Sequence, residues 1–122
     1  MNKFLDNAVI YQIYPISFYD SNGDGYGDFN GITQKLDYIK DLGVNIIWLN
    51  PIYMSPFMDG GYDISDYEKV NPIFGTEDDL KALLNKAHSL GIKVISMILF
   101  RNGFNLLSVY FISQGLITLS KP

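Results

Sequence analysis

The chain has 122 residues and a net charge of −4, so it is long enough for one small domain and carries no basic surplus for nucleic acid. It has no cysteine, which excludes disulfides, a thiolate nucleophile and thiolate metal sites. No stretch reaches the ~18 apolar residues of a membrane span, and the first residues do not resemble a signal peptide. We therefore expect a cytoplasmic protein that binds neither membranes nor nucleic acids.

A loop rich in side-chain oxygens follows the first predicted strand, residues 8–14, whose β-branched and aromatic residues are typical of a buried strand. The loop carries Asp20, Asn22, Asp24 and Asp28, and glycines between them allow the backbone to curl. Oxygen donors at this spacing suit a hard cation, Ca²⁺ or alternatively Mg²⁺.

Two other interpretations of this loop need weighing. An EF-hand requires a bidentate Glu at its twelfth position, where this chain has Gly31, so an EF-hand is not expected. A solvated turn of Asx and Gly residues would need no ligand and is the more common use of such a composition. The position of the loop between a strand and a helix favours a functional role, because α/β proteins keep their functional groups there.

Further along the chain, the spacing of apolar residues predicts a helix over residues 31–42. Residues 44–49 form a nearly continuous apolar run, which indicates a strand buried on both faces. The polar segment 50–75 is longer than a connection requires, so we expect it to be functional.

A second helix is predicted to begin at Thr76, which can cap it ahead of three acidic residues, and to end before Gly91. Residues 93–100 are predicted to form the third strand. The single histidine, His88, lies within the predicted helix and is interpreted as a partly exposed helix residue, not a ligand.

The predicted order is strand, helix, strand, helix, strand, which implies parallel strands joined by right-handed connections. Ligands of such sheets bind beyond the carboxyl ends of the strands, where the loops 19–30 and 50–75 both emerge. The pattern does not separate a barrel from an open, flavodoxin-like sheet.

Five segments, in this order, resemble the N-terminal part of the α-amylase superfamily of glycoside hydrolases, and most closely its α-glucosidase and oligo-1,6-glucosidase branch. The segments are residues 8–18, 20–31, 42–51, 61–76 and 91–95. Together they cover about residues 5–96 of the chain.

The resemblance implies a (β/α)8 TIM barrel, a fold that typically needs about 250 residues. Residues 1–96 would then be a partial catalytic barrel that holds the first three β/α units, followed by an unrelated tail, residues 97–122. Family members hydrolyse α-glucosidic bonds with retention, using a nucleophile and an acid/base carboxyl that follow the fourth and fifth strands. This chain has neither region, so we expect a truncated α-glucosidase-like protein that does not catalyse alone.

The resemblance also assigns site residues. Asp59 and Tyr62 correspond to residues that line the family's subsite for the non-reducing terminal sugar of an α-linked glucose oligosaccharide; without the resemblance, this segment is interpreted as a simple turn. The implied metal ligands are the side chains of Asp20, Asn22, Asp24 and Asp28 and the carbonyl oxygen of Tyr26.

After Ile95 the resemblance stops. The family has an Asp in its third strand and an Asn-His pair at the end of that strand, whereas this chain has Met97, Arg101 and Asn102. One hypothesis is a shift of the reading frame near residue 96, which sequencing of the gene would test: no family-like continuation in another frame would refute it. Alternative functions are a non-enzymatic metal- or sugar-binding module, and a piece that another chain completes.

Overall fold

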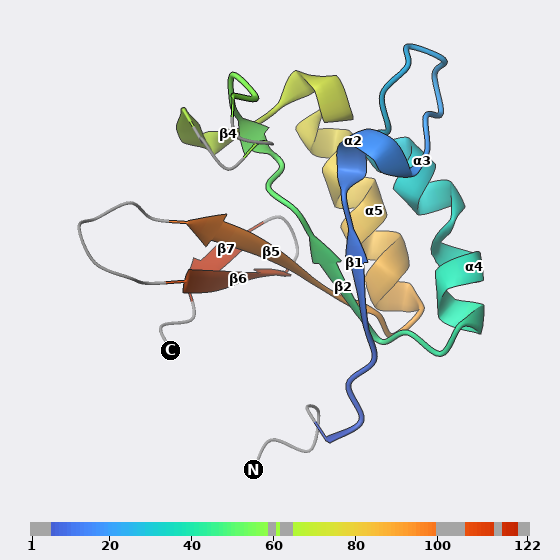
Figure 1. Ribbon diagram of the computed structural model, residues 1–122. Coiled ribbons are helices and arrows are strands. Elements are labelled where there is room, and N and C mark those ends of the chain that lie inside the picture. The colour runs from blue at the N-terminus through green and yellow to red at the C-terminus, as the bar shows by residue number, and fades with distance from the viewer. Residues whose placement is uncertain (1–5, 59–60, 62–64, 100–106, 114–115, 120–122) are drawn as a thin grey trace.

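The computed structural model describes residues 6–58, 61, 65–99, 107–113 and 116–119 (Figure 1). Its strands are β1 (Ile10–Ile13), β2 (Ile46–Leu49), β3 (Tyr53–Met54), β4 (Asp66–Val70), β5 (Lys93–Leu99), β6 (Leu107–Ser113) and β7 (Leu116–Leu119). Its helices are α2 (Pro15–Phe18), α3 (Phe29–Gln34), α4 (Leu36–Asp41) and α5 (Glu77–Ser89), and Pro72–Phe74 forms a 3-10 turn, η1.

A parallel sheet forms the centre of the molecule. β1 pairs with β2, and β2 pairs with β5, both in parallel. The helices α3, α4 and α5 lie together on one side of these strands (Figure 1). Side chains alternate along the strands, so that Ile13, Leu49 and Val94 pack into the buried core between the strands and the helices. The described part of the chain is therefore an α/β fold with parallel strands, as the sequence predicts.

The sheet continues beyond the region of predicted strands. β6 pairs antiparallel with β5, where Ile95 lies opposite Phe111, and β7 pairs antiparallel with β6, which gives the order β1-β2-β5-β6-β7. The sequence does not predict these two strands, because residues 97–122 are characterised there only by their lack of resemblance. β5 also runs across residue 96, so the expected boundary lies within a strand.

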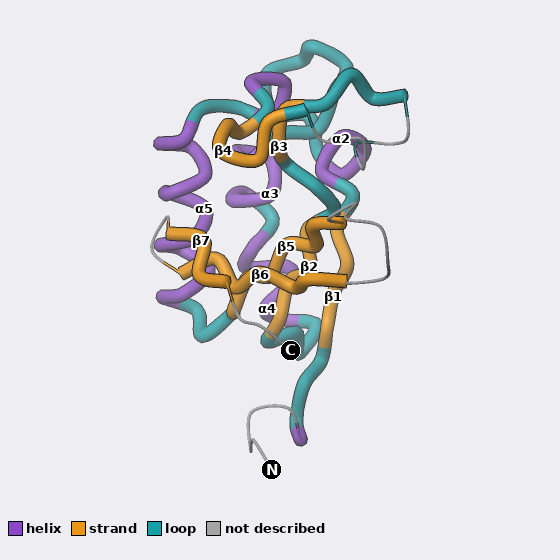
Figure 2. Tube along the Cα trace, turned by 90° about the vertical axis from the view of Figure 1, so that its left-hand side faces the viewer, coloured by secondary structure: helices purple, strands orange, loops and turns teal. Residues whose placement is uncertain are grey.

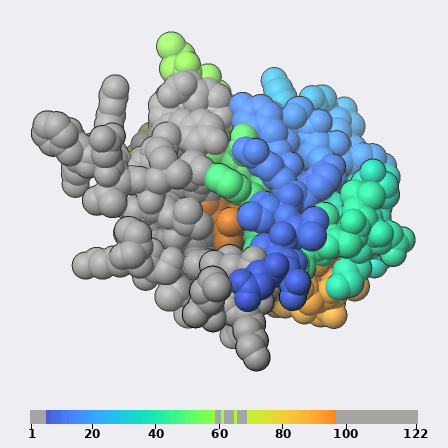
Figure 3. All heavy atoms as spheres, turned by 60° about the horizontal axis from the view of Figure 1, so that its bottom comes forward, coloured from blue at the N-terminus to red at the C-terminus, as the bar shows by residue number. Residues whose placement is uncertain are grey.

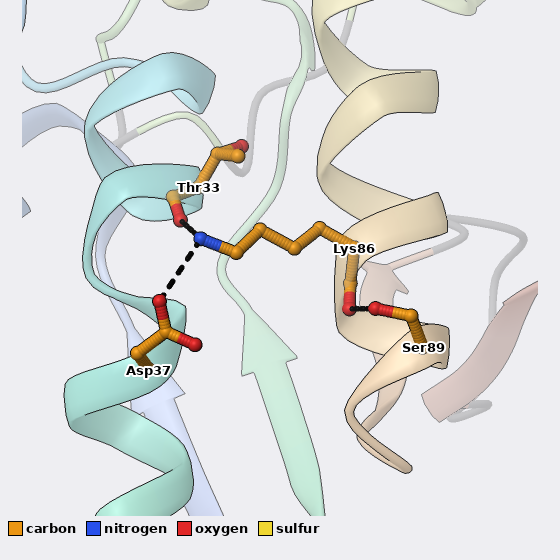
Figure 4. A network of polar contacts seen from close by, with 4 residues as sticks. All are labelled: Thr33, Asp37, Lys86 and Ser89. Atoms are coloured by element: carbon orange, nitrogen blue, oxygen red, sulfur yellow. Dashed lines mark hydrogen bonds and ion pairs between the residues drawn. The ribbon is translucent and has the colours of Figure 1, made fainter.

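The helix predicted for residues 31–42 begins earlier and is broken. It begins at Phe29, because Asp28 caps it, and it is interrupted at Lys35, between α3 and α4. Near the break, Nζ of Lys86 in α5 donates to the carbonyl oxygen of Thr33 at 3.2 Å and lies 3.3 Å from Oδ2 of Asp37 (Figure 4). Helix kinks occur where a side chain inserts into the backbone hydrogen-bond ladder, as this donor does.

The second long helix matches its prediction closely. Thr76 and Asp79 form a reciprocal capping box: the Thr76 hydroxyl accepts from the Asp79 amide at 3.1 Å, and Oδ2 of Asp79 accepts from the Thr76 amide at 2.9 Å. The buried residues of α5 are Leu80, Leu83, Leu84 and Ala87. They pack with α3, α4 and Phe74 of η1 into one core cluster.

The described helices include none long and apolar enough to cross a membrane. The start of the described chain, in dark blue, lies at the surface of the face that Figure 3 shows. Val9 and Ile10 are about half exposed, at 47% and 50%. β1 is thus an edge strand with apolar side chains in contact with solvent, at least among the residues that the structure describes.

Both long connections lie at one end of the molecule. β1 leads into α2 and the oxygen-rich loop, while β2 leads into β3, β4 and η1 (Figures 1 and 2). This is the end at which the parallel strands terminate, the position expected for ligand-binding loops in such sheets.

Candidate functional site

The oxygen-rich loop, defined here as residues 20–28, is fastened at its exit to the chain that precedes it. The Gly27 amide donates to the carbonyl oxygen of Ile16 at 2.7 Å, and the Asp28 amide donates to that of Tyr19 at 3.1 Å. A Cβ at Gly27 would overlap the Pro15 carbonyl oxygen, so only glycine permits this approach. The two ends of the loop are therefore held close together between α2 and α3.

Asp20 organises the first half of the loop. Its Oδ1 accepts from the amides of Asn22 at 3.2 Å and Gly23 at 2.7 Å, and its Oδ2 accepts from the Gly25 amide at 2.8 Å. These bonds, the one from Gly25 above all, hold the pKa of Asp20 below its usual value, because they stabilise the charged carboxylate. Gly23 and Gly25 have φ values of 79° and 93°, which glycine adopts without strain.

Asn22 and Asp24 repeat the same local motif. Oδ1 of Asn22 accepts from the Asp24 amide at 3.0 Å, and Oδ1 of Asp24 accepts from the Tyr26 amide at 2.8 Å. Each is an Asx turn, in which a side-chain oxygen bonds the backbone two residues on. The loop thus places three side-chain oxygen groups in successive turns, as the turn interpretation predicts.

Asp28 has a different position, because it is buried at 4% exposure and caps α3. Its Oδ1 accepts from the Gly31 amide and from the Ser21 hydroxyl, both at 2.7 Å, and its Oδ2 accepts from the Ser21 amide at 3.0 Å. Ser21 was not singled out by the sequence, since nothing in the spacing marks its pairing with Asp28. Together these two residues join the start of the loop to its end.

The donor set of the loop bears directly on the predicted cation site. Within the described part of the chain, no group of three or more Asp, Glu, His or Cys side chains is arranged to hold a metal. A carboxylate has about four lone-pair sites, and Asp20 and Asp28 each use three of them on protein donors. Because Asp24 uses one, acceptor capacity remains on all three carboxylates, and the predicted set is chemically suited to a hard cation.

The second part of the predicted site is only partly described. Asp59 and Tyr62, the predicted sugar-binding residues, lie outside the described residues. Gly61 between them is described and buried, with a φ of 93°. Phe57, whose ring lies beside Gly61, also has a positive φ, of 56°. No pattern in the sequence predicts this backbone conformation. A bulky residue in this region costs on the order of 1–3 kcal/mol and persists only where surrounding contacts hold it.

Similarity to known proteins agrees with the resemblance noted in the sequence. Residues 12–102 match the model of the α-amylase catalytic domain. An oligo-1,6-glucosidase of Heyndrickxia coagulans is 55% identical over 95 residues, which cover 78% of this chain and 17% of that protein. An α-glucosidase of Saccharomyces cerevisiae is 60% identical over 94 residues, covering 77% of this chain and 16% of that protein.

Among solved structures, trehalose-6-phosphate hydrolase of Bacillus licheniformis superposes with a TM-score of 0.72 at 57% identity, over 74% of this chain and 16% of that one. The chain therefore spans about one sixth of the length of the relatives that it matches. The matched range of the family model ends at residue 102, beyond the boundary at residue 96 that the sequence predicts.

Proposed function

This chain belongs to the family of α-amylase catalytic domains, and from that membership we propose that β1, β2 and β5 are the first three strands of a (β/α)8 barrel. The partial barrel would occupy residues 1–96 and a tail without family resemblance residues 97–122, although the family model matches as far as residue 102. The parallel pairing of these strands and their helical connections support the proposal.

The activity we propose for the barrel as a whole is retaining hydrolysis of α-glucosidic bonds in glucose oligosaccharides. The observation that carries it is the identity of 55–60% to an oligo-1,6-glucosidase and an α-glucosidase over about 95 residues. Retaining cleavage needs a nucleophile and an acid/base carboxyl, which in the family follow later strands. We therefore propose that this chain contributes to sugar binding and does not cleave on its own.

Within that function, Asp59 and Tyr62 would bind the terminal glucose. A carboxylate accepts hydrogen bonds from sugar hydroxyls, and an aromatic ring packs on the apolar face of a sugar. Gly61 lies between the two residues in the sequence and is buried, with a left-handed φ of 93° that glycine adopts without strain.

For the oxygen-rich loop, we propose that Asp20, Asn22, Asp24 and Asp28, with the carbonyl oxygen of Tyr26, hold Ca²⁺, or Mg²⁺ as the alternative. The cation would have a structural role: it would neutralise the acidic side chains and stiffen the loop. The support is the donor set, which consists of oxygens alone with acceptor capacity remaining on the carboxylates.

Titration with maltose and isomaltose, followed by calorimetry and by an assay for released glucose, tests the proposal. We expect saturable, weak binding, with a dissociation constant of about 1 mM or above, no release of glucose, and loss of binding in Asp59→Ala. A matched control is Asp41→Ala, which changes an exposed acid at the end of α4. Glucose release by the purified chain would contradict the proposal that it does not cleave on its own. Absence of binding would contradict the proposed sugar site.

Absence of cation binding would be a separate result, because the loop and the sugar segment are assigned independently. Calcium titration of the chain and of Asp20→Asn measures it directly. We expect binding in the parent chain and a loss of affinity in the variant, since the substitution removes the negative charge of one proposed ligand. Equal affinities in the two proteins would contradict the assignment.

A further inference from the structure

Asparagine is followed directly by glycine at three places in the chain, residues 22–23, 30–31 and 102–103. Such a pair is prone to loss of the side-chain amide, because glycine has no Cβ to hinder attack by its own backbone nitrogen. The third pair lies outside the described residues. The first two pairs have the same local chemistry, so the fold decides which of them reacts.

The reaction needs only water as a co-reactant. The backbone nitrogen of the glycine bonds to Cγ of the asparagine, and the bond from Cγ to Nδ2 breaks. Nδ2 leaves as ammonia and carries away the hydrogen of the glycine amide, which leaves a five-membered cyclic imide. Water then opens one of the two imide carbonyl groups, and the product is aspartate or isoaspartate.

The pair Asn22–Gly23 is open to this reaction. Both residues are exposed, and a Cβ placed on Gly23 would meet no atom within 4 Å, so water and the cyclic imide have room. Oδ1 of Asn22 accepts from the Asp24 amide at 3.0 Å. This Asx turn closes a ring that contains both Cγ of Asn22 and the nitrogen of Gly23. The side chain is therefore folded toward the nitrogen that attacks it.

The pair Asn30–Gly31 is closed to it. Both residues belong to α3, and Gly31 is buried, where an added Cβ would overlap the Tyr19 carbonyl oxygen. The Asn30 side chain contacts the carboxylate of Asp79 in α5. A helical backbone does not admit the five-membered ring, so the start of α3 would have to open before Asn30 could react.

The hydrogen bonds of the two attacking nitrogens do not explain a difference between the pairs. The Gly23 amide donates to Oδ1 of Asp20 at 2.7 Å, and the Gly31 amide donates to Oδ1 of Asp28 at 2.7 Å. What differs is the cost of breaking these bonds. The first lies in an exposed loop, whereas the second belongs to a helix whose Phe29 and Ile32 are fully buried.

We propose that Asn22 is a site of spontaneous deamidation and that α3 protects Asn30 from the same reaction. The modification adds one negative charge to the oxygen-rich loop, which already carries the carboxylates of Asp20, Asp24 and Asp28. The isoaspartate product also lengthens the backbone of the loop by one carbon atom. The proposal is independent of the cation proposed for this loop, because it rests on exposure and backbone conformation alone.

Incubation of the full 122-residue chain in mildly alkaline buffer without added metal tests the proposal. Samples are taken over time from the native chain and from the chain in concentrated urea, and are digested and analysed by mass spectrometry. Methylation by an isoaspartyl methyltransferase reports the isoaspartate product. In the native chain we expect Asn22 to convert roughly tenfold faster than Asn30, or more. In urea the two rates should be comparable, because the fold no longer separates the pairs.

Two matched variants locate the signal. Asn22→Gln should remove the fast phase, since the longer side chain forms its ring far more slowly. Asn30→Gln should leave the fast phase unchanged. Equal rates at Asn22 and Asn30 in the native chain would overturn the proposal. It would also fail if Asn22 converted in urea but not in the native chain, or if the fast phase persisted in Asn22→Gln.

Discussion

The oxygen-rich loop and the segment 50–75 lie at the same end of the sheet but are held together by different forces. Every hydrogen bond that organises the loop from within joins residues at most seven positions apart, as between Ser21 and Asp28. In the described part of the segment 50–75, contacts also join residues far apart in the sequence, such as the rings of Phe57 and Phe74 and the bond from the Asn71 amide to the Ile52 carbonyl oxygen at 2.8 Å. Local polar bonds give a loop its shape without the rest of the fold, whereas distant apolar contacts exist only once the core has formed.

This difference in bonding bears on the functions proposed for the loop and for the segment 50–75. Polar side chains that fold a loop locally can also face a cation, because a carboxylate retains lone pairs after it accepts amide protons. In the segment 50–75, the rings of Phe57 and Phe74 pack against each other instead. The proposed division, with a structural cation in one loop and sugar contacts in the other, follows this difference in construction.

Removal of the Phe74 ring should have the largest effect. We expect Phe74→Ala to lower the free energy of unfolding by roughly 3–5 kcal/mol, because a fully buried ring that contacts Phe29 and Phe57 is replaced by a cavity. Urea denaturation measures the change, and Phe74→Leu, which fills more of the space, should lose less. A loss no greater than that of Asp28→Ala would contradict the view that distant apolar contacts dominate here.

Asp28→Ala should follow, with a loss of roughly 2–3 kcal/mol. The substitution removes the cap of α3 and leaves the Ser21 and Gly31 donors without the acceptors that they have in the fold. Asp28→Asn keeps one side-chain oxygen as acceptor and should lose less in the same urea experiment. Equal losses for Asn and Ala would show that charge, not the hydrogen-bond geometry, fastens the loop.

A smaller loss is expected where the segment 50–75 meets α5. Thr76→Ala should lower the free energy of unfolding by about 1 kcal/mol, since it removes the hydroxyl that accepts from the Asp79 amide. Thr76→Ser preserves this acceptor and serves as the control. If both variants lost the same amount in thermal or urea unfolding, the side-chain methyl group and not the cap would explain the effect.

Acidification should act on the loop and leave the aromatic contacts alone. Backbone amides, first that of Gly25, hold the pKa of Asp20 below its ordinary value of 3.8. A lowered pKa in the fold means that this carboxylate stabilises the fold above the unfolded value, and that its contribution is lost as pH falls through the folded value. A hydrogen bond from the Thr76 amide likewise holds the pKa of Asp79 below its ordinary value.

NMR titration of the Gly25 amide should therefore give a midpoint below pH 3.8, with no corresponding change at Phe74. Asp20→Asn has no titrating carboxyl at this position and should remove the transition. A midpoint at or above 3.8 in the parent chain would mean that the three amide bonds to Asp20 do not persist in solution.

The sequence alone was sufficient for features that depend on neighbouring residues. The strand–helix alternation, the cap at Thr76 and the series of turns in the oxygen-rich loop follow from periodicity and from side-chain chemistry within a few residues. The identity of the parallel strands also followed, because a nearly continuous apolar run such as residues 44–49 is stable only when covered on both faces.

Only the tertiary structure decided the rest. The break at Lys35 accompanies a donor from Lys86 in a different helix, β6 and β7 are defined by pairing with the edge of β5, and the positive φ of Phe57 is maintained by the distant ring of Phe74. In each case the local sequence permits several conformations of similar energy, and a contact formed by residues far along the chain selects one of them.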